Sequence, residues 1–192
     1  MRTVNAKNRG YYKIEGAVRA FDFDFLGKTV LDIGSSTGGF TEIALEHGAE
    51  CVIAVEKGTH QMKAPLRYDP RVKLHEKTDI FDFTLAEAGK PDVIVADVSF
   101  LSLTNILKYA KLRLARSDTE FLVMLKPQFE ATPAQLHKGV VKNEKIRRDI
   151  IKNFEQWLKQ HGFVIVKKRD NDLAGKNGNL ERFYYLKLDA TR

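Results

Sequence analysis

The stretch Val30-Leu31-Asp32-Ile33-Gly34-Ser35-Ser36-Thr37-Gly38-Gly39-Phe40 carries the strongest structural signal in this sequence. Its apolar start predicts a buried strand, its glycines predict a turn, and Thr41-Glu42-Ile43-Ala44-Leu45 predicts the start of a helix. A strand, a glycine-rich turn and a helix in this order form the first unit of a doubly wound parallel sheet, where nucleotide-like ligands bind.

The spacing of the glycines indicates which ligand this turn suits. They follow the pattern G-x-x-x-G-G, whereas a dinucleotide site follows G-x-G-x-x-G, and Ser36 stands where the second glycine of that fingerprint would be. Asp32 precedes the turn, and its carboxylate would repel a phosphate but attract a cation. S-adenosylmethionine carries an ammonium, a sulfonium and ribose hydroxyls, so the turn favours this methyl donor over NAD or ATP.

Length and composition indicate one soluble globular domain of 192 residues without a signal peptide or a membrane span. Cys51 is the only cysteine, which fits a reducing cytoplasm and excludes a disulfide or a cysteine-rich metal site; we predict no metal. The net charge of +7 fits binding to a polyanion, although a solvated basic surface explains it equally well. The cations gather in two clusters: Lys7, Arg9, Lys13 and Arg19, and then Lys138, Lys142, Lys145, Arg147 and Arg148.

Apolar runs alternate with helix-like stretches along the chain, which predicts a parallel sheet with helices on both faces. The expected strands are 29–33, 51–55, 72–75, 93–96, 120–125, 164–167 and 183–188, and the expected helices are 11–21, 37–47, 58–66, 102–114 and 143–160. No helix separates the last two strands, so the final strand is expected to run antiparallel. The fold class is therefore α/β, with the seven-stranded, mostly parallel, Rossmann-like sheet of class I methyltransferases. We expect a basic N-terminal extension with a short helix over residues 1–27 and a methyltransferase domain over residues 28–192.

Acidic residues end four successive strands, at the edge where open α/β sheets bind their ligands. They are Asp32, Glu56, Asp79 and Asp97. Glu56 is expected to accept hydrogen bonds from the donor's ribose, and Asp79 from the adenine amine, with Ile80 packed on the ring. Any one of these acids alone is equally well explained as a helix cap. The predicted donor site comprises Asp32, Gly34, Ser35, Ser36, Thr37, Gly38, Gly39, Phe40, Glu56, Lys57, Asp79, Ile80 and Asp97.

Lys126 ends the apolar run Phe121-Leu122-Val123-Met124-Leu125 and precedes Pro127, which favours an extended backbone there. An ammonium at the end of a buried strand is costly unless it is paired or reaches solvent. Asp97 ends the neighbouring strand and is the expected partner. Burial lowers a lysine pKa and a neighbouring carboxylate raises it, so the sequence leaves the charge of Lys126 open.

Six segments resemble FtsJ-like methyltransferases, and most closely the TlyA-type hemolysin/ribosomal RNA methyltransferases. They are Asn8–Lys13, Leu31–Thr41, Ala96–Leu103, Leu125–Glu130, Gly139–Val141 and Gly178–Glu181. The resemblance implies a Lys-Asp-Lys-Glu tetrad for ribose methylation, and Lys13, Asp97, Lys126 and Glu181 occupy its positions. Relatives usually carry an N-terminal RNA-binding domain as well, and we expect residues 1–192 not to include one.

The resemblance implies a cytoplasmic enzyme that uses S-adenosylmethionine to methylate ribose 2′-hydroxyls of ribosomal RNA, free or in a ribosomal subunit. A methyltransferase acting on a base nitrogen or a small molecule is an alternative. It is disfavoured because Asp97-Val98-Ser99-Phe100 stands where an Asn-Pro-Pro-Tyr-like motif would grip an exocyclic amine. A hemolysin-like or RNA-binding protein without enzymatic activity is the second alternative. No apolar span supports lysis, and intact ligand and tetrad positions argue against loss of activity.

Overall fold

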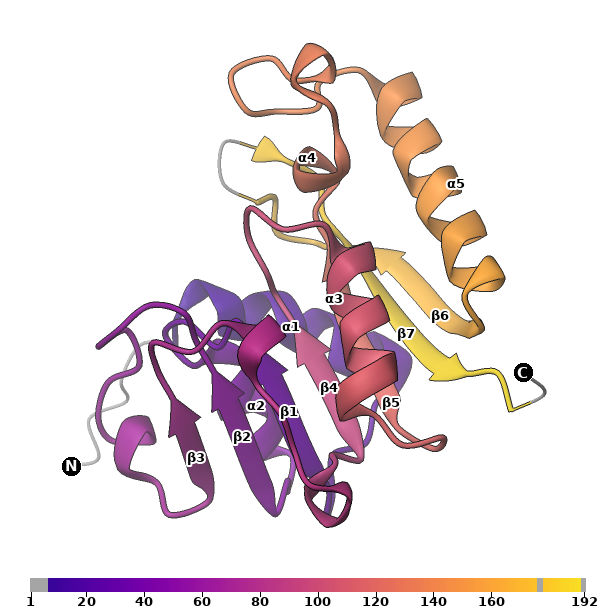
Figure 1. Ribbon diagram of the computed structural model, residues 1–192. Helices are drawn as coiled ribbons and strands as arrows, with labels where there is room; N and C mark the ends of the chain where they lie inside the picture. Colours follow the sequence, from indigo (N-terminus) through magenta and orange to yellow (C-terminus); the bar gives the residue numbers. More distant parts are fainter. Residues whose placement is uncertain (1–6, 176–177, 191–192) are drawn as a thin grey trace.

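A computed structural model describes residues 7–175 and 178–190 of the chain, and its centre is a seven-stranded sheet (Figure 1). The strand order is β3-β2-β1-β4-β5-β7-β6. The strands are β1 (Thr29–Ile33), β2 (Cys51–Val55), β3 (Val72–His75), β4 (Val93–Ala96), β5 (Glu120–Leu125), β6 (Phe163–Asp170) and β7 (Arg182–Leu188).

The first five strands pair in parallel, and β7 is antiparallel to both of its neighbours, β5 and β6. Parallel strands buried on both faces require the near-continuous apolar runs that the sequence contains. The order of the strands reverses between the neighbouring strands β1 and β4. Ligands of open α/β sheets bind beside such a switch point, at the carboxyl ends of the strands. The predicted fold class is confirmed.

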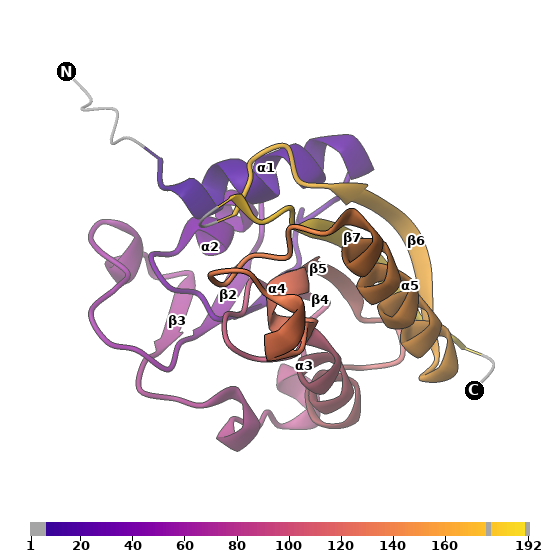
Figure 2. The same ribbon diagram turned by 90° about the horizontal axis from the view of Figure 1, so that it is seen from above.

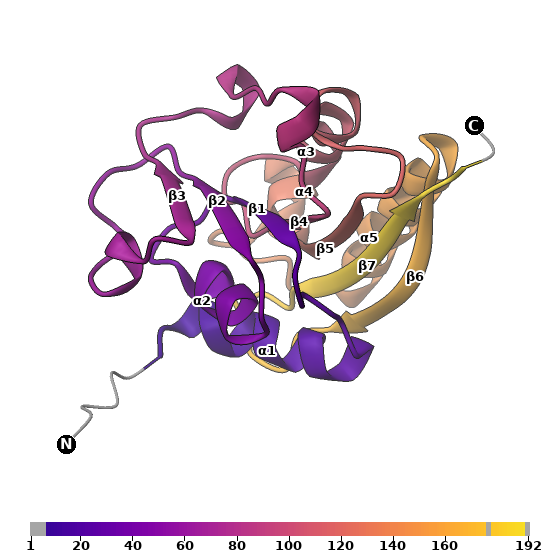
Figure 3. The ribbon, with the colours of Figure 1, turned by 90° about the horizontal axis from the view of Figure 1, so that it is seen from below.

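Four of the five α-helices in the described residues cover the sheet in two layers, with α1 and α2 on one face and α3 and α5 on the other, while the short α4 follows β5 at the carboxyl edge (Figures 2 and 3). These five helices are α1 (Arg9–Phe21), α2 (Gly39–Glu46), α3 (Leu103–Tyr109), α4 (Pro127–Glu130) and α5 (Glu144–Gln160). Short 3₁₀ turns lie at Leu66–Tyr68, Ile80–Asp82, Glu87–Gly89 and Pro133–Gln135, and a π-helical turn, Ala110–Leu114, continues α3.

The N-terminal segment packs into the main body of the protein. Ile14, Val18 and Phe25 are buried in one apolar cluster with Val30 of β1 and Ile43 of α2. The division of the chain at residue 27 stays a prediction, and residues 1–6 of that segment lie outside the described residues. What the contacts show is that α1 covers one face of the sheet near the predicted site.

The predicted helix over residues 58–66 is wrong. This segment is a chain of bends after β2, and it reaches only the 3₁₀ turn Leu66–Tyr68. Its composition explains the difference, because Gly58 and Pro65 both disfavour a helix interior, and His60 has a φ of +54°. This segment borders the cavity described below, so the error concerns the site directly.

Within the described residues, no helix is both long enough and apolar enough to cross a membrane.

Candidate active site

A cavity of about 410 Å³ opens at the carboxyl ends of β1, β2 and β4, the edge that faces the viewer in Figure 2. Seven residues of the predicted donor site line it: Gly34, Ser36, Glu56, Lys57, Asp79, Ile80 and Asp97. Its remaining lining includes Gln61, Thr78 and the run Val98–Leu101. The lining therefore combines charged and polar side chains with apolar surface.

Glu56 follows β2 and is fixed by the backbone around it. Its Oε2 accepts a hydrogen bond from the Ser36 amide at 2.9 Å, and its Oε1 accepts one from the Gly58 amide at 2.6 Å. Gln61 Nε2 donates a longer hydrogen bond of 3.3 Å to Glu56 Oε1, and Gln61 Oε1 accepts one from the Ser36 hydroxyl at 2.8 Å. Glu56 is therefore oriented toward the turn after β1, where a ribose diol would meet it.

Asp79 and Ile80 stand after β3, on the next wall of the cavity. Asp79 caps a short 3₁₀ turn by accepting from the Phe81 amide at 3.1 Å, and Lys57 lies 2.8 Å from its other oxygen. The hydrogen bond from Lys57 lowers the pKa of Asp79, so this carboxylate is ionised at neutral pH. Ile80 is buried beside it and supplies an apolar surface of the kind that an adenine ring requires.

Asp32 lies beneath the turn instead of in the cavity lining. It is fully buried and accepts a 2.7 Å hydrogen bond from the Thr41 hydroxyl of α2, and its second oxygen has no hydrogen-bond partner among the described residues. Burial raises the pKa of Asp32 to about 7, and the nearby carboxylates Asp97 and Glu56 act in the same direction. Its direct contact with a donor stays a prediction.

Five further residues of the turn also lie outside the cavity lining, and the structure gives several of them a packing role. At Gly39, a Cβ would lie 2.4 Å from the Tyr11 amide nitrogen, and at Gly38 one would lie 2.4 Å from Leu66 Cδ2. Phe40 is buried against Phe183, with ring centroids 6.0 Å apart. The predicted turn residues outside the lining are Ser35, Thr37, Gly38, Gly39 and Phe40. These glycines allow α1 and the 57–68 loop to approach the turn closely.

Lys126 and Asp97 meet at the rim of this cavity. Lys126 Nζ lies 2.5 Å from Asp97 Oδ1 and donates a hydrogen bond of 2.9 Å to the Ser99 hydroxyl. The contact with Asp97 is an ion pair without hydrogen-bond geometry, and Oδ1 has no hydrogen-bond partner within residues 7–175 and 178–190. The Lys126 side chain is only 9% exposed, so the pair is screened from bulk water. The predicted partnership is present.

Lys13 and Glu181 form a second buried ion pair, 2.6 Å from Nζ to Oε2. Lys13 comes from α1, and Glu181 stands immediately before β7, so the pair joins the two ends of the chain. The strand register relates it to the first pair. Leu125 lies opposite Arg182 in the antiparallel ladder, so Lys126, which follows Leu125, and Glu181, which precedes Arg182, stand at the same edge of the sheet. The four predicted tetrad residues therefore converge at one edge of the sheet.

Glu130 links two of the segments that carry the family resemblance, 96–103 and 125–130. Its carboxylate accepts from the Ser102 hydroxyl and from the Leu103 amide, each at 2.7 Å, at the start of α3. An acidic group at a helix N-terminus satisfies free amides and the helix dipole. The segment Lys126–Glu130 is thereby tied to the segment Asp97–Leu103, and both surround the lysine.

The sequence analysis missed several residues of this site. Ser99 binds the central lysine and Gln61 binds Glu56, yet neither was among the predicted site residues. Phe100 has a φ of +66° and is 87% exposed beside Phe129, with ring centroids 5.1 Å apart. Ser99 and Phe100 were visible as part of a quoted segment, whereas Gln61 stood in the segment that was wrongly predicted as a helix.

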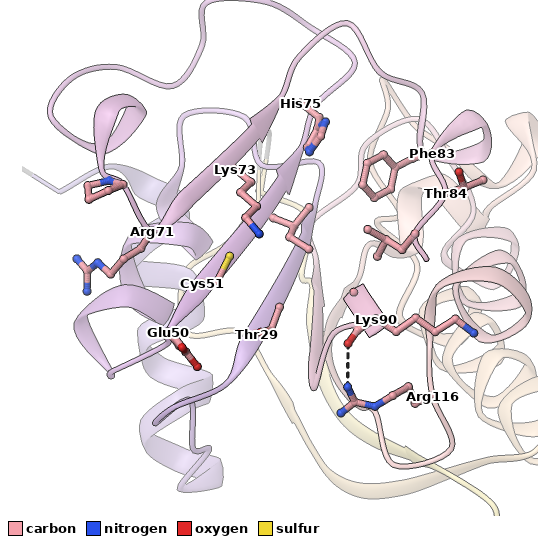
Figure 4. A pocket seen from close by; sticks show the side chains of 14 residues that line it. Thr29, Glu50, Cys51, Arg71, Lys73, His75, Phe83, Thr84, Lys90 and Arg116 are labelled. Carbon is pink, nitrogen blue, oxygen red and sulfur yellow. Dashed lines mark hydrogen bonds between the residues drawn. The ribbon is translucent and has the colours of Figure 1, made fainter. Parts of the chain in front are cut away.

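A second and larger hollow, about 670 Å³, runs from the starts of β1 and β2 along β3 (Figure 4). It contains none of the predicted site residues. Both arginines that line it are paired locally, because Arg71 binds Asp69 and Arg116 binds Asp92 and Asp118. The smaller cavity, which contains the strand-end acids, is therefore the candidate active site.

The sheet order, the reversed last strand and a cavity lined by strand-end acids define a methyltransferase of the Rossmann-like class. A comparison with solved structures agrees at the level of the fold. An S-adenosylmethionine-dependent methyltransferase from Listeria monocytogenes superposes with a TM-score of 0.66 at 19% identity, covering 92% of this chain and all of that one.

The family model of FtsJ-like methyltransferases matches residues 6–188, and the chain belongs to this family. It is 36% identical over 187 residues to the 16S/23S rRNA (cytidine-2′-O)-methyltransferase TlyA of Mycobacterium tuberculosis, covering 96% of this chain and 69% of TlyA. It is 35% identical over 190 residues to Hemolysin A of Brachyspira hyodysenteriae, covering 94% and 76%. A hemolysin structure from Lactococcus lactis superposes with a TM-score of 0.89 at 34% identity, covering 96% and 89%.

Proposed function

We propose that this protein transfers the methyl group of S-adenosylmethionine to a ribose 2′-hydroxyl of ribosomal RNA. The observation that carries the proposal is the position of the Lys126–Asp97 pair. Asp97 lines the cavity that suits the donor, and Lys126 binds it from the neighbouring strand. The family and the printed activity of the mycobacterial relative agree with this reaction.

The residues of the cavity fit the donor. Glu56 is held in place for a ribose diol, Asp79 is an ionised acceptor for an exocyclic amine, and Ile80 and Val98 offer apolar surface to an adenine. Asp97 adds a negative charge, which suits a sulfonium and an ammonium. Bound there, the donor supplies an electrophilic methyl group.

The chain's own contribution to the reaction is to orient the ribose hydroxyl and to manage its proton. A hydroxyl is a weak nucleophile until its proton is drawn away during attack. Lys126 is placed to bind the hydroxyl oxygen and to accept or relay the proton, with Asp97 and Ser99 fixing the position of Nζ. Glu181 and Lys13 stand at the same edge of the sheet as Lys126, where their charges contribute to the electrostatic field around that lysine.

RNA contacts are supported by two kinds of surface residue. Phe100 and Phe129 stand beside the cavity, and exposed aromatic rings stack on unpaired bases. Lys138, Lys142, Lys145 and Arg148 are exposed on the 131–148 segment and suit phosphates. The two N-terminal tyrosines differ in their exposure: Tyr11 is buried and its hydroxyl donates a hydrogen bond to Glu46, whereas Tyr12 is half exposed. The single cysteine, Cys51, favours a cytoplasmic location.

The proposal is tested by incubating the purified chain with methyl-labelled donor and with ribosomal RNA, separated subunits or whole ribosomes. Label is expected in RNA with the wild type and not with Lys126→Ala. Lys73→Glu, which changes a charge in the opposite hollow, serves as the matched control and is expected to transfer label normally. Absence of label from every RNA substrate would contradict the proposal.

A further inference from the structure

Two segments that are distant in the sequence, 139–141 and 178–181, are joined by one side chain. Asn179, only 4% exposed, lies in the segment Gly178–Glu181 and contacts the segment Gly139–Val141. Its Oδ1 accepts from the Val141 amide at 3.2 Å, and its Nδ2 donates to the Gly139 carbonyl at 3.1 Å. A single amide thus satisfies both a buried donor and an acceptor of the other segment.

The segment that Asn179 binds is a tight hairpin with a basic tip. His137 and Val140 exchange two backbone hydrogen bonds of 2.9 and 3.0 Å. Between them, Lys138 and Gly139 have φ values of +50° and +78°, as a two-residue hairpin turn of the I′ type requires. Both turn residues are exposed, so the ammonium of Lys138 is presented to solvent at the tip.

The other end of the connection is the acid of the tetrad. Asn179 stands two residues before Glu181, and its own carbonyl accepts from the Gly175 amide at 2.6 Å. A Cβ on Gly175 would lie 2.4 Å from Glu181 Oε1, so this loop closes directly around the carboxylate. The Glu181 carbonyl accepts from the Asn171 amide at 2.9 Å, and the Leu180 carbonyl accepts from buried Arg147 at 3.3 Å.

We infer that Asn179 is a positioning residue that holds Glu181, and through it Lys13, in register with the 137–140 hairpin, whose Lys138 tip contacts a phosphate of the substrate RNA. This inference rests on the proposed function. Its physical basis is that Glu181 approaches Lys13 to 2.6 Å in a buried setting, where a small displacement of the carboxylate alters the charge balance of the tetrad. Contact of RNA with the hairpin and order at the tetrad are thereby coupled through one amide.

The kinetic test compares Asn179→Ala and Asn179→Asp with the control Asn171→Ala, which removes a buried amide from the same loop that does not contact the hairpin. Both Asn179 variants are expected to lower kcat by about 10- to 100-fold and to shift the pH profile of kcat, with donor Kd within about twofold of wild type. Asp should be no better than Ala, because it places an oxygen against the Gly139 carbonyl. A kcat within threefold of wild type for either variant, or the same loss in Asn171→Ala, would overturn the inference.

The hairpin tip has its own variant. Lys138→Asn creates an Asn-Gly turn, which favours the same hairpin geometry while removing the cation. It is expected to raise KM for RNA severalfold with a smaller effect on kcat, the reverse of the Asn179 pattern. An unchanged KM for RNA would show that the tip of the hairpin does not contact the RNA.

Hydrogen exchange of the free protein decides the connection independently of any RNA activity. In Asn179→Ala, the amides of Val141 and of Asn171 are expected to exchange at least tenfold faster than in wild type, because each depends on the position of the Asn179–Glu181 segment. Unchanged exchange at Asn171 would show that Glu181 is held without Asn179. If wild-type protein methylates no RNA, the proposed function fails while this measurement still decides the connection.

Discussion

Lys126 Nζ lies 2.5 Å from Asp97 Oδ1, while its hydrogen bond runs to the Ser99 hydroxyl at 2.9 Å. The two charged residues follow adjacent strands, β5 and β4, and both lie at the edge of the sheet where the donor cavity opens. The ammonium is therefore held by charge on one side and by a hydroxyl on the other. Asp97 lines the donor cavity and Lys126 binds it, so the pair lies beside the place proposed for the donor.

Replacing Lys126 separates proton management from binding. Lys126→Ala is expected to lower kcat by orders of magnitude with donor and RNA still bound, because the lost interaction acts mainly in the transition state. Lys126→Arg should be nearly as damaging, since a guanidinium stays protonated and cannot accept a proton. Steady-state kinetics and donor calorimetry check both variants. Near-wild-type turnover by the arginine variant would limit Lys126 to electrostatic positioning.

The Lys13–Glu181 pair allows stability to be separated from activity. Breaking a buried ion pair from one side costs about 3–5 kcal/mol, because a charge is left without its partner. Glu181→Leu alone should therefore be strongly destabilised, and adding Lys13→Met should restore much of the free energy of unfolding. Activity is expected to stay lost in the double variant, since its chemistry needs both charges. Urea denaturation and label transfer are the measurements; recovery of both together would show that the pair is only structural.

The raised pKa of Asp32 predicts that the stability of the folded protein depends on pH. Its pKa is raised from 3.8 to about 7, so between these values the folded chain binds a proton that the unfolded chain has lost. The free energy of unfolding should therefore fall as pH rises from about 4 to about 7, by on the order of a few kcal/mol. Asp32→Asn should lose this dependence and gain stability relative to wild type at pH 8. Denaturation at several pH values checks it, and an unchanged slope would show that Asp32 is already ionised.

Donor affinity tests whether Asp32 and Glu56 contact the bound donor directly, and it can be measured on the same Asp32→Asn protein. The side chain is buried beneath the turn and outside the cavity lining, whereas Glu56 lines the cavity. Glu56→Ala is expected to weaken donor binding at least tenfold by calorimetry. A near-native Kd for the donor in Glu56→Ala would show that Glu56 does not bind the donor's ribose.

RNA binding is expected to weaken steeply with salt, because phosphate contacts release counterions. Charge reversal at Lys142 and Arg148 should weaken binding to a similar extent for many RNA sequences, since phosphate contacts carry little base information. Lys73→Glu is the matched control on the opposite side of the protein. Binding that does not change across a salt titration would make the basic cluster a feature of solubility alone.

The sequence allowed the sheet to be predicted because its signals are local. The run from Val30 to Ile33 reads as a strand, and Val72 to His75 was bounded correctly, because parallel strands need short apolar runs between turn residues. Pairing across the sheet is not local. That Leu125 lies opposite Arg182 depends on the register of β5 against β7, which residues within one strand do not specify.

Residues at the turn show the same limit within the site. A glycine in a ligand-binding pattern was taken as a ligand contact, yet Gly39 is required by the approach of the Tyr11 backbone from α1. Gln61 was missed because it acts from an irregular loop, where side-chain direction follows from tertiary contacts. Asp32 shows that a carboxylate at a strand end can bind a neighbouring helix, here through the Thr41 hydroxyl, and its contact with a donor stays a prediction.

The central claim is that the acceptor is a ribose hydroxyl, and the chemistry of the product tests it most directly. Methylation of a 2′-hydroxyl protects the adjacent phosphodiester from alkaline cleavage, whereas a methylated base does not. RNA labelled by the wild-type protein should therefore yield its label in an alkali-resistant dinucleotide, with none formed by Lys126→Ala. Label recovered in mononucleotides on a methylated base would contradict the assignment of the Lys126–Asp97 site to ribose methylation.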